Sequence, residues 1–195
     1  MITTYIPYAP KDSDMNLGAE YNRLMSECRT EWACFLDHDA MFLHRDWYHD
    51  LTEATEVAEA NGIGLMSCMA NRIGTPQQAL KQHAGDHDIM RLRQVARVRR
   101  TLNMVDGKQQ PKLVPDGEYV SGVMLLVYKM AWEEMGGFAD GFLGVDYDAC
   151  ERMRRAGWRV GLLPGVVVYH WYRGDGNFDH VRKANSMHTN PALKR

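Results

Sequence analysis

The chain has 195 residues, of which 45% are hydrophobic and 25% charged, and its formal net charge is −2 at pH 7. This composition is typical of a globular protein with enough residues for a real core, and we expect a single domain over residues 1–195. The near-neutral charge argues against a nucleic-acid-binding function. No run of apolar residues approaches the roughly 18 of a membrane-spanning helix.

The cysteines and the N-terminus predict a cytoplasmic location. No two cysteines have the CxxC spacing of a redox or zinc motif, and Cys34 lies inside an apolar run, so we expect reduced thiols. The first residues lack the charged and apolar regions of a signal peptide. The four cysteines are Cys28, Cys34, Cys68 and Cys150.

The first half of the chain alternates short apolar runs with segments of helical periodicity. Pro7 and Pro10 break the first run, Asn16 is a suitable N-cap for the first helix, and Gly62 is a suitable C-cap for the second. The expected elements are a strand over 2–10, a helix over 17–28, a strand over 32–36, a helix over 46–61 and a strand over 63–70.

The second half follows the same rule until the last residues. The tail over 172–195 is rich in Gly, Asn and His, and we expect it to be mobile. The expected elements are a helix within 86–102, a loop over 104–118, a strand over 119–128, a helix over 129–135, a helix ending at Gly157, and a strand over 159–169 interrupted at Pro164–Gly165.

The helix expected within 86–102 is basic, with five arginines, and it leaves two interpretations open. It is either a solvated helix packed through its apolar stripe or a docking face for an anionic membrane or polyanionic acceptor. We favour the solvated helix, because one basic helix in a neutral protein is weak evidence of docking. Peripheral membrane contact through 86–102 remains the alternative.

Two aspartates close the most apolar of the expected strands. The run from Trp32 to Leu36 suits a strand buried on both faces, and Asp37 and Asp39 follow it at once. Carboxylates at the end of a buried strand are costly without a positive partner, and ligands of open α/β sheets bind at that end. A divalent cation carrying a nucleotide diphosphate would supply the partner.

The same tripeptide occurs again at 86–88, where it serves as an internal control. No apolar run precedes Asp86-His87-Asp88, which opens a polar helical stretch. Aspartate is expected there as an N-cap or first-turn residue. The sequence context, and not the tripeptide itself, therefore selects Asp37 and Asp39.

A second group of polar residues lies near the C-terminal end. Asp146 and Asp148 fall at a helix start, where acids are stabilised by the helix dipole, and Asp148 can also pair with Arg152. Asp146 follows an aromatic-rich loop and could act as a general base. His170 ends the last strand, and a histidine there is either a packing residue or a metal ligand.

Taken in order, these pieces resemble the GT-A fold glycosyltransferases, most closely family 2. The resemblance covers residues 16–171, most of the chain. The matching segments are the strand ending in Asp37-His38-Asp39, Gly136-Gly137-Phe138-Ala139-Asp140, Gly144-Val145-Asp146-Tyr147-Asp148 with the arginines and glycine after it, and Val168-Tyr169-His170.

The resemblance implies a GT-A (Rossmann-like) α/β fold with a mixed, mostly parallel sheet flanked by helices. It also implies a nucleotide-sugar donor such as a UDP-sugar, Mn²⁺ or Mg²⁺, and a saccharide, lipid-linked or protein acceptor. The implied roles are Asp37, Asp39 and His170 for the metal, Asp146 for the general base of an inverting transfer, and Pro7, Tyr8, Asn22, Asp37, Arg72 and Trp171 for the nucleotide sugar. Arg72 is a weaker candidate in this set, and so is Gln78 beside it. Trp171 could equally be an aromatic residue at the rim of the core.

Two departures from the family pattern keep a second function open. Val145 stands where family 2 enzymes usually have Glu, and the helix and strand that the family normally inserts before Asn16 are missing, which shortens the nucleotide-binding half. Asp12 or Asp14 could take over the nucleobase contact. The alternatives to a glycosyltransferase are a non-catalytic sugar-nucleotide-binding protein of the same fold and, third, a metal-dependent nucleotidyltransferase.

Overall fold

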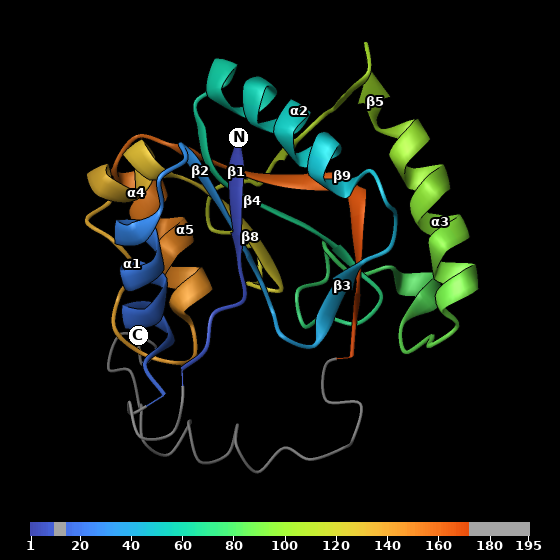
Figure 1. Cartoon of the computed structure of the whole chain (residues 1–195), viewed down its shortest axis with the longest axis horizontal. Helices are drawn as coiled ribbons and strands as arrows, with labels where there is room; N and C mark the ends of the chain where they lie inside the picture. Colours follow the sequence, from blue (N-terminus) through green and yellow to red (C-terminus); the bar gives the residue numbers. More distant parts are fainter. Residues whose placement is uncertain (10–14, 172–195) are drawn as a thin grey trace.

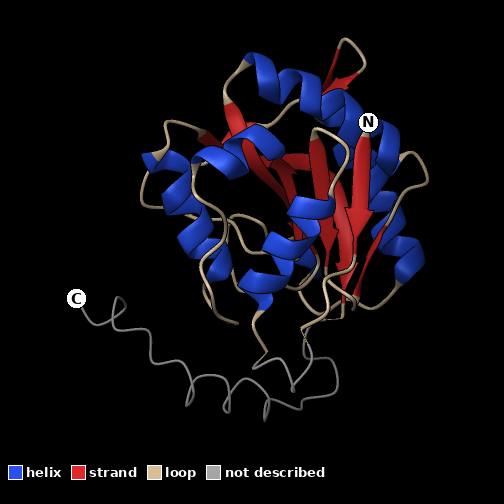
Figure 2. Cartoon of the chain, turned by 60° about the vertical axis from the view of Figure 1, so that its left-hand side comes forward, coloured by secondary structure: helices blue, strands red, loops and turns tan. Residues whose placement is uncertain are grey.

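A seven-stranded sheet with helices on both faces forms the centre of the computed structural model, which describes residues 1–9 and 15–171 (Figures 1 and 2). The strands of the sheet are β1 (Ile2–Tyr5), β2 (Trp32–Leu36), β3 (Ala40–Phe42), β4 (Ile63–Ala70), β7 (Lys112–Leu113), β8 (Met124–Tyr128) and β9 (Arg159–His170). The helices are α1 (Leu17–Glu27), α2 (Trp47–Ala60), α3 (Ile89–Leu102), α4 (Lys129–Glu134) and α5 (Val145–Arg155), and β5 (Met104–Val105) pairs with β6 (Lys108–Gln109) in a separate hairpin.

The strand order is β1-β2-β8-β4-β9-β3, with β7 added beside β9. Strands β1, β2, β4 and β9 run in one direction, while β8, β3 and β7 run in the other. The expected mixed, mostly parallel sheet flanked by helices is thereby confirmed. The carboxyl ends of β2, β4 and β9 all lie at one edge of the sheet, which is where such sheets bind ligands.

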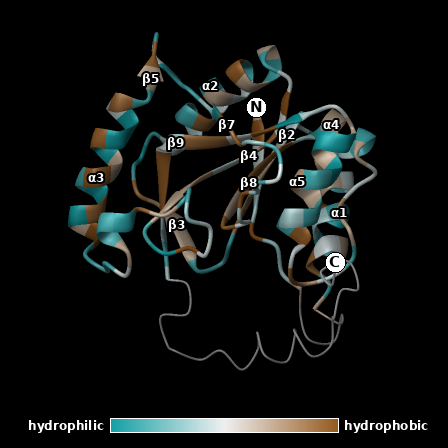
Figure 3. Cartoon of the chain, turned by 180° about the vertical axis from the view of Figure 1, so that it is seen from behind, coloured by the Kyte–Doolittle hydropathy of each residue, from teal (hydrophilic) through white to brown (hydrophobic). Residues whose placement is uncertain are grey.

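The sheet is buried from both sides because its strands are apolar on both faces. Along β2, Ala33 and Phe35 join the core under α1, α4 and α5, whereas Trp32, Cys34 and Leu36 join the core under α2. Figure 3 shows the central strands as the hydrophobic part of the molecule and the helices as striped with polar residues. This explains why 32–36 is an unbroken apolar run.

The helix boundaries follow the predicted caps. The side chain of Asn16 accepts a hydrogen bond from the N–H of Ala19, and that of Asp88 accepts from Met90 and Arg91. Helix α5 begins after Gly144, whose φ of 78° lies in the left-handed region that glycine adopts most easily. Its first turn carries Asp146 and Asp148, as the sequence predicted.

Some predicted boundaries are wrong. The first strand ends at Tyr5 and not at residue 10, and the strand expected over 119–128 forms only from Met124 onward. Residues 104–118 contain three short strands where a loop was expected. Strand β9 continues through Pro164–Gly165, where the predicted interruption takes the form of a register shift against β4.

Three further expectations concern chain organisation. The four cysteines are free, as predicted, and all four are buried, as expected for Cys34. In the described ranges, no helix has the length and apolarity to cross a bilayer. Asp12, Asp14 and the tail from 172 to 195 lie outside the described residues.

Candidate metal centre and active site

The turn between β2 and β3 brings both predicted aspartates next to His170. Asp37 donates its N–H to the carbonyl of Val123 at 3.0 Å and accepts from the N–H of Ala40 at 3.0 Å, which fixes a tight turn. Strand β3 then pairs with β9 so that Ala40 lies opposite His170. The register of two neighbouring strands therefore places Asp39 beside the imidazole.

The three side chains converge. His170 Nε2 lies 3.2 Å from Asp39 Oδ1 and 3.7 Å from Asp37 Oδ2. One ligand atom from each residue lies within 4.8 Å of the others. Two carboxylate oxygens and one imidazole nitrogen form a donor set that suits Mn²⁺ or Mg²⁺, so these residues fit the predicted cation.

Hydrogen bonds to residues 71 and 72 fix the orientation of the His170 ring. Its Nδ1 donates to the main-chain carbonyl of Arg72 at 2.8 Å, so in the neutral ring Nε2 presents its lone pair to the carboxylates. The N–H of His170 donates to Asn71 Oδ1 at 2.7 Å. The imidazole is thus held with Nε2 facing the two carboxylates, the position that a metal ligand requires.

The pKa values of the two aspartates shift in opposite directions because their burial and their neighbouring charges differ. Burial raises the pKa of Asp37 to about 6; the charge of His170 opposes this rise, and the charges of Asp39 and Asp146 add to it. Burial acts in the same direction on Asp39, but when the His170 ring is protonated its hydrogen bond and positive charge outweigh burial and hold the pKa of Asp39 below its usual value. A bound cation would relieve the repulsion at Asp37.

Asp146 faces the same cavity as two of the candidate metal ligands, Asp37 and His170. A cavity of about 160 Å³ is lined by Asp37, Asp146 and His170, together with Tyr21 and residues of the 121–123 and 142–145 segments. Asp146 Oδ2 accepts from the N–H of Gly122 at 3.0 Å, and Oδ1 accepts from the N–H of Tyr147 at 2.9 Å. Burial raises its pKa despite these hydrogen bonds, as expected of a carboxylate able to take a proton.

The other residues that the resemblance assigned to the nucleotide sugar lie outside this cavity. Pro7 and Tyr8 follow β1, and the Tyr8 side chain is 74% exposed. Arg72 contributes its carbonyl to His170. Trp171 is half-exposed, donates its N–H to the carbonyl of Asp39 at 3.0 Å and packs against the ring of His87.

Asn22 and Gln78 have structural partners. The Asn22 amide accepts from the N–H of Phe138 and from Trp132 Nε1 and donates to the Phe138 carbonyl. Gln78 is buried and connects Ser67 and Cys68 to the N–H of Ser121. Asn22 therefore anchors the 137–138 turn, and Gln78 anchors the segment that binds Asp146.

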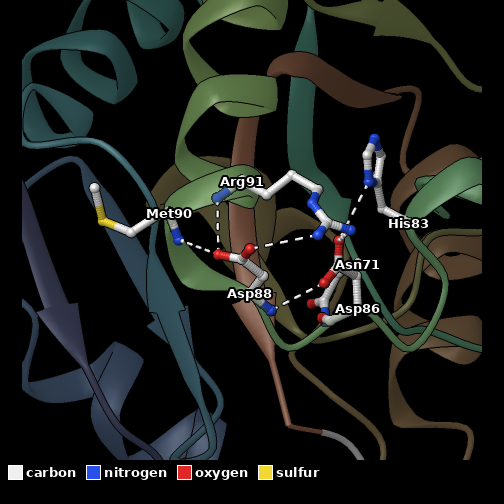
Figure 4. Close-up of polar contacts among 6 residues, drawn as sticks. All are labelled: Asn71, His83, Asp86, Asp88, Met90 and Arg91. Atoms are coloured by element: carbon white, nitrogen blue, oxygen red, sulfur yellow. Dashed lines mark hydrogen bonds and ion pairs between the residues drawn. The ribbon is translucent and has the colours of Figure 1, made fainter.

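The control tripeptide serves as a helix cap. Asp88 accepts from the N–H groups of Met90 and Arg91, and the Arg91 guanidinium pairs with Asp86 (Figure 4). The Asn71 side chain donates to the Asp86 carbonyl, so this cluster supports Asn71, which in turn binds His170. The context argument separating residues 37–39 from 86–88 is consistent with this geometry.

Asn71 and Gly122 are the site residues that sequence reasoning missed. Asn71 directly follows the buried strand β4, in the same position that Asp37 holds after β2, and this was a usable signal. Gly122 was assigned to a strand, and only the tertiary contact with Asp146 shows its part in the site.

Comparisons with known proteins add little to this geometry. No protein-family profile and no curated protein sequence matches the chain. Among solved structures, the mannosyltransferase PcManGT from Pyrobaculum calidifontis, in complex with GDP-Man and Mn²⁺, matches with a TM-score of 0.48 and 18% identity. The match covers 78% of this chain and 35% of that protein.

Proposed function

We propose that this chain is a metal-dependent glycosyltransferase that takes its sugar from a nucleotide-diphosphate donor such as a UDP-sugar. The observation that carries the proposal is the convergence of Asp37, Asp39 and His170 on one point at the carboxyl edge of the sheet. A bound Mn²⁺ or Mg²⁺ would neutralise the charge of the leaving diphosphate. The proposed assignment to family 2 is supported by the sequence resemblance alone.

Each residue of the candidate site has a separate part in this proposal. Asp39 and His170 hold the cation, and Asp37 shares it or contacts the ribose of the donor. Asp146 takes the proton of the acceptor hydroxyl, which corresponds to an inverting transfer. The N–H of Gly122 and that of Tyr147 hold the Asp146 carboxylate in place while it does so.

The size of the cavity limits which part of the donor it admits. Its volume of about 160 Å³ is below the roughly 300–1,000 Å³ of most ligand pockets. The nucleoside would therefore lie outside it, along the surface after β1. The exposed Tyr8 ring lies there and offers a face for stacking on the base.

A screen of UDP-, GDP- and other nucleotide sugars with Mn²⁺ tests the proposal. Released nucleoside diphosphate is measured with and without candidate saccharide, lipid-linked and protein acceptors. We expect release with at least one donor, and none after Asp39→Ala. Absence of metal-dependent nucleotide binding by wild type would overturn the proposal, with binding followed by thermal shift.

The runner-up is a binding protein of the same fold that performs no transfer. The observation favouring it is Val145, an apolar core residue where the family usually has Glu. This alternative predicts Mn²⁺-dependent nucleotide binding without release of diphosphate from any donor. In that case Asp146→Asn would leave all measured properties unchanged.

A further inference from the structure

A second pocket, of about 750 Å³, lies on the other side of β3, between the turn after β3 and helix α3. Phe42 and Trp47 form part of one wall, with their rings stacked at a centroid distance of 4.2 Å. Met90 and the arginines of α3 form the facing wall, and the Met90 side chain points away from the Asp86–Asp88 cluster (Figure 4).

The pocket is rich in positive charge. Its lining includes Arg45, Arg93, Arg97 and Arg100 but a single carboxylate, that of Asp46. Arg93 and Arg97 are one helical turn apart and lie on the same face of α3. Within the part of the chain that the structure describes, neither of these two guanidinium groups forms an ion pair.

The fourth arginine is fixed by a neighbouring helix. Arg100 donates through Nε and Nη2 to the two carboxylate oxygens of Asp50, at 2.7 and 2.9 Å. Asp50 is 1% exposed, so this pair connects α2 to α3 beneath the pocket. The pair joins the two walls of the pocket. Because the Asp50 carboxylate neutralises Arg100, the positive charges of Arg93 and Arg97 are the ones left without a counter-charge among the described residues.

His44 supplies the independent observation that a ligand belongs here. Its side chain lines the pocket and is only 6% exposed, yet neither ring nitrogen makes a hydrogen bond with any described residue. Asp50 Oδ2 lies 3.5 Å from Nε2 and forms an ion pair with the ring only when the ring is protonated. Buried polar groups in proteins are almost always hydrogen-bonded, so a ring N–H without an acceptor is a site that a ligand oxygen could complete. Because both ring nitrogens are shielded from solvent, this contact requires the ring to turn toward the pocket.

We infer that this pocket binds a phosphate-bearing ligand, with Arg93 and Arg97 supplying the charge and His44 a buried hydrogen-bond donor. Guanidinium groups match phosphate oxygens in geometry as well as charge. The stacked Phe42 and Trp47 rings offer an apolar surface to the group that carries the phosphate. The inference does not depend on the proposed transferase function, because the pocket shares no lining residue with the metal centre.

The test measures binding of inorganic pyrophosphate by calorimetry in the presence of EDTA, which removes any contribution of the metal centre. We expect wild type to bind and Arg93→Gln/Arg97→Gln to lose affinity by roughly tenfold or more. Arg91→Gln is the matched control, because Arg91 is on the same helix but pairs with Asp86 and Asp88 outside the pocket. The control should bind like wild type.

A second measurement reports on His44 directly. Pyrophosphate should shift the His44 ring signals in ¹H–¹⁵N NMR spectra, and His44→Phe should weaken binding while the circular dichroism spectrum stays unchanged. Absence of pyrophosphate binding to wild type would refute the inference. Equal loss in Arg91→Gln and in the double variant would refute it as well, since the effect would then be general electrostatics.

Vesicles identify the source of the phosphate. Phosphatidic acid in phosphatidylcholine is compared with phosphatidylcholine alone, with pyrophosphate as competitor. Binding to the acidic vesicles that pyrophosphate displaces and the double variant lacks assigns the pocket to a lipid phosphate. Binding of pyrophosphate without binding to vesicles assigns it to a free phosphorylated compound, and both results support the inference.

Discussion

Asp146 is the residue on which catalysis, as distinct from binding, depends in the proposed function. Asp146→Asn keeps the size of the side chain but removes its capacity to take a proton. We expect the rate of sugar transfer to fall by about 10²–10⁴-fold with little change in Mn²⁺-dependent nucleotide binding. Steady-state kinetics and a nucleotide thermal shift on the same preparations separate the two effects.

Asp148→Asn is the matched control for this measurement. Asp148 stands in the same first turn of α5 but pairs with Arg152, away from the cavity lining. It should retain the wild-type rate of transfer. Equal losses in both variants would mean that Asp146 acts only through the structure of the helix start.

Asn71 positions His170, the candidate metal ligand, and is not itself a member of the candidate ligand set. Its amide connects the N–H of His170 to the carbonyl of Asp86, and it is completely buried. We expect Asn71→Ala to weaken Mn²⁺ affinity by about 10–100-fold, the usual effect of removing such support. Electron paramagnetic resonance of free Mn²⁺ measures the affinity directly, and Gln77→Ala, a half-exposed residue farther along the same segment, is the control.

At the level of elements, an ion pair between Asp50 and Arg100 joins α2 to α3. Asp50 is 1% exposed and Arg100 is 25% exposed, so the two partners differ in access to water. Arg100→Met leaves a buried carboxylate without its partner and should lower the free energy of unfolding by about 3–5 kcal/mol. Asp50→Asn should cost less, because the Arg100 guanidinium can still reach solvent.

Urea unfolding of both single variants and of Asp50→Leu/Arg100→Met checks this prediction. The double variant should recover part of the loss, since the buried charge is gone. Arg97→Met, on the same helix but outside the pair, should change stability by less than about 0.5 kcal/mol. A smaller loss for Arg100→Met than for Asp50→Asn would contradict the burial argument.

The sequence predicts elements well where local pattern and tertiary environment agree. Residues 32–36 are apolar throughout and form a strand buried on both faces, and Asn16 and Asp88 cap the helices that follow them. Residues 119–123 also have a strand-like pattern, but they do not form a strand. The N–H groups of this segment donate instead to side chains distant in sequence, those of Gln78 and Asp146. Such contacts leave no local signal.

The candidate site was predictable to the extent that its residues stand at strand ends. Asp37, Asp39 and His170 could be placed at one edge of the sheet from the sequence, but their distances depend on the pairing of β3 with β9, and β3 was not expected. The resemblance assigned Asn22 to the nucleotide sugar. Its hydrogen bonds to the 138 segment could not be predicted from the sequence.

For the molecule as a whole, His44 makes stability depend on pH. Burial lowers the pKa of His44, the charge of Arg100 acts in the same direction, and the charges of Asp50 and Asp46 oppose them. Above the unfolded pKa of about 6.5 both states are neutral, so this group has no effect there. As the pH falls below about 6.5, the unfolded chain takes the proton first, and folding stability declines until the lowered folded pKa is reached.

Unfolding by urea at about pH 7.5 and about pH 5.5 checks the effect. The loss of stability between the two should be smaller in His44→Phe than in wild type. His49→Gln is the control, because that side chain is 62% exposed and should leave the pH dependence unchanged. The same dependence in wild type and in His44→Phe would assign the acid loss to other groups.

The hydrogen bond that holds the His170 ring ends on the peptide oxygen of residue 72. Every amino acid supplies that oxygen, so position 72 can be exchanged freely without unsettling the imidazole. Only a change in the path of the chain, such as a deletion or an extra residue after β4, would remove it. Position 72 should therefore keep the imidazole in place after any substitution, whereas a change in the length of the segment should not.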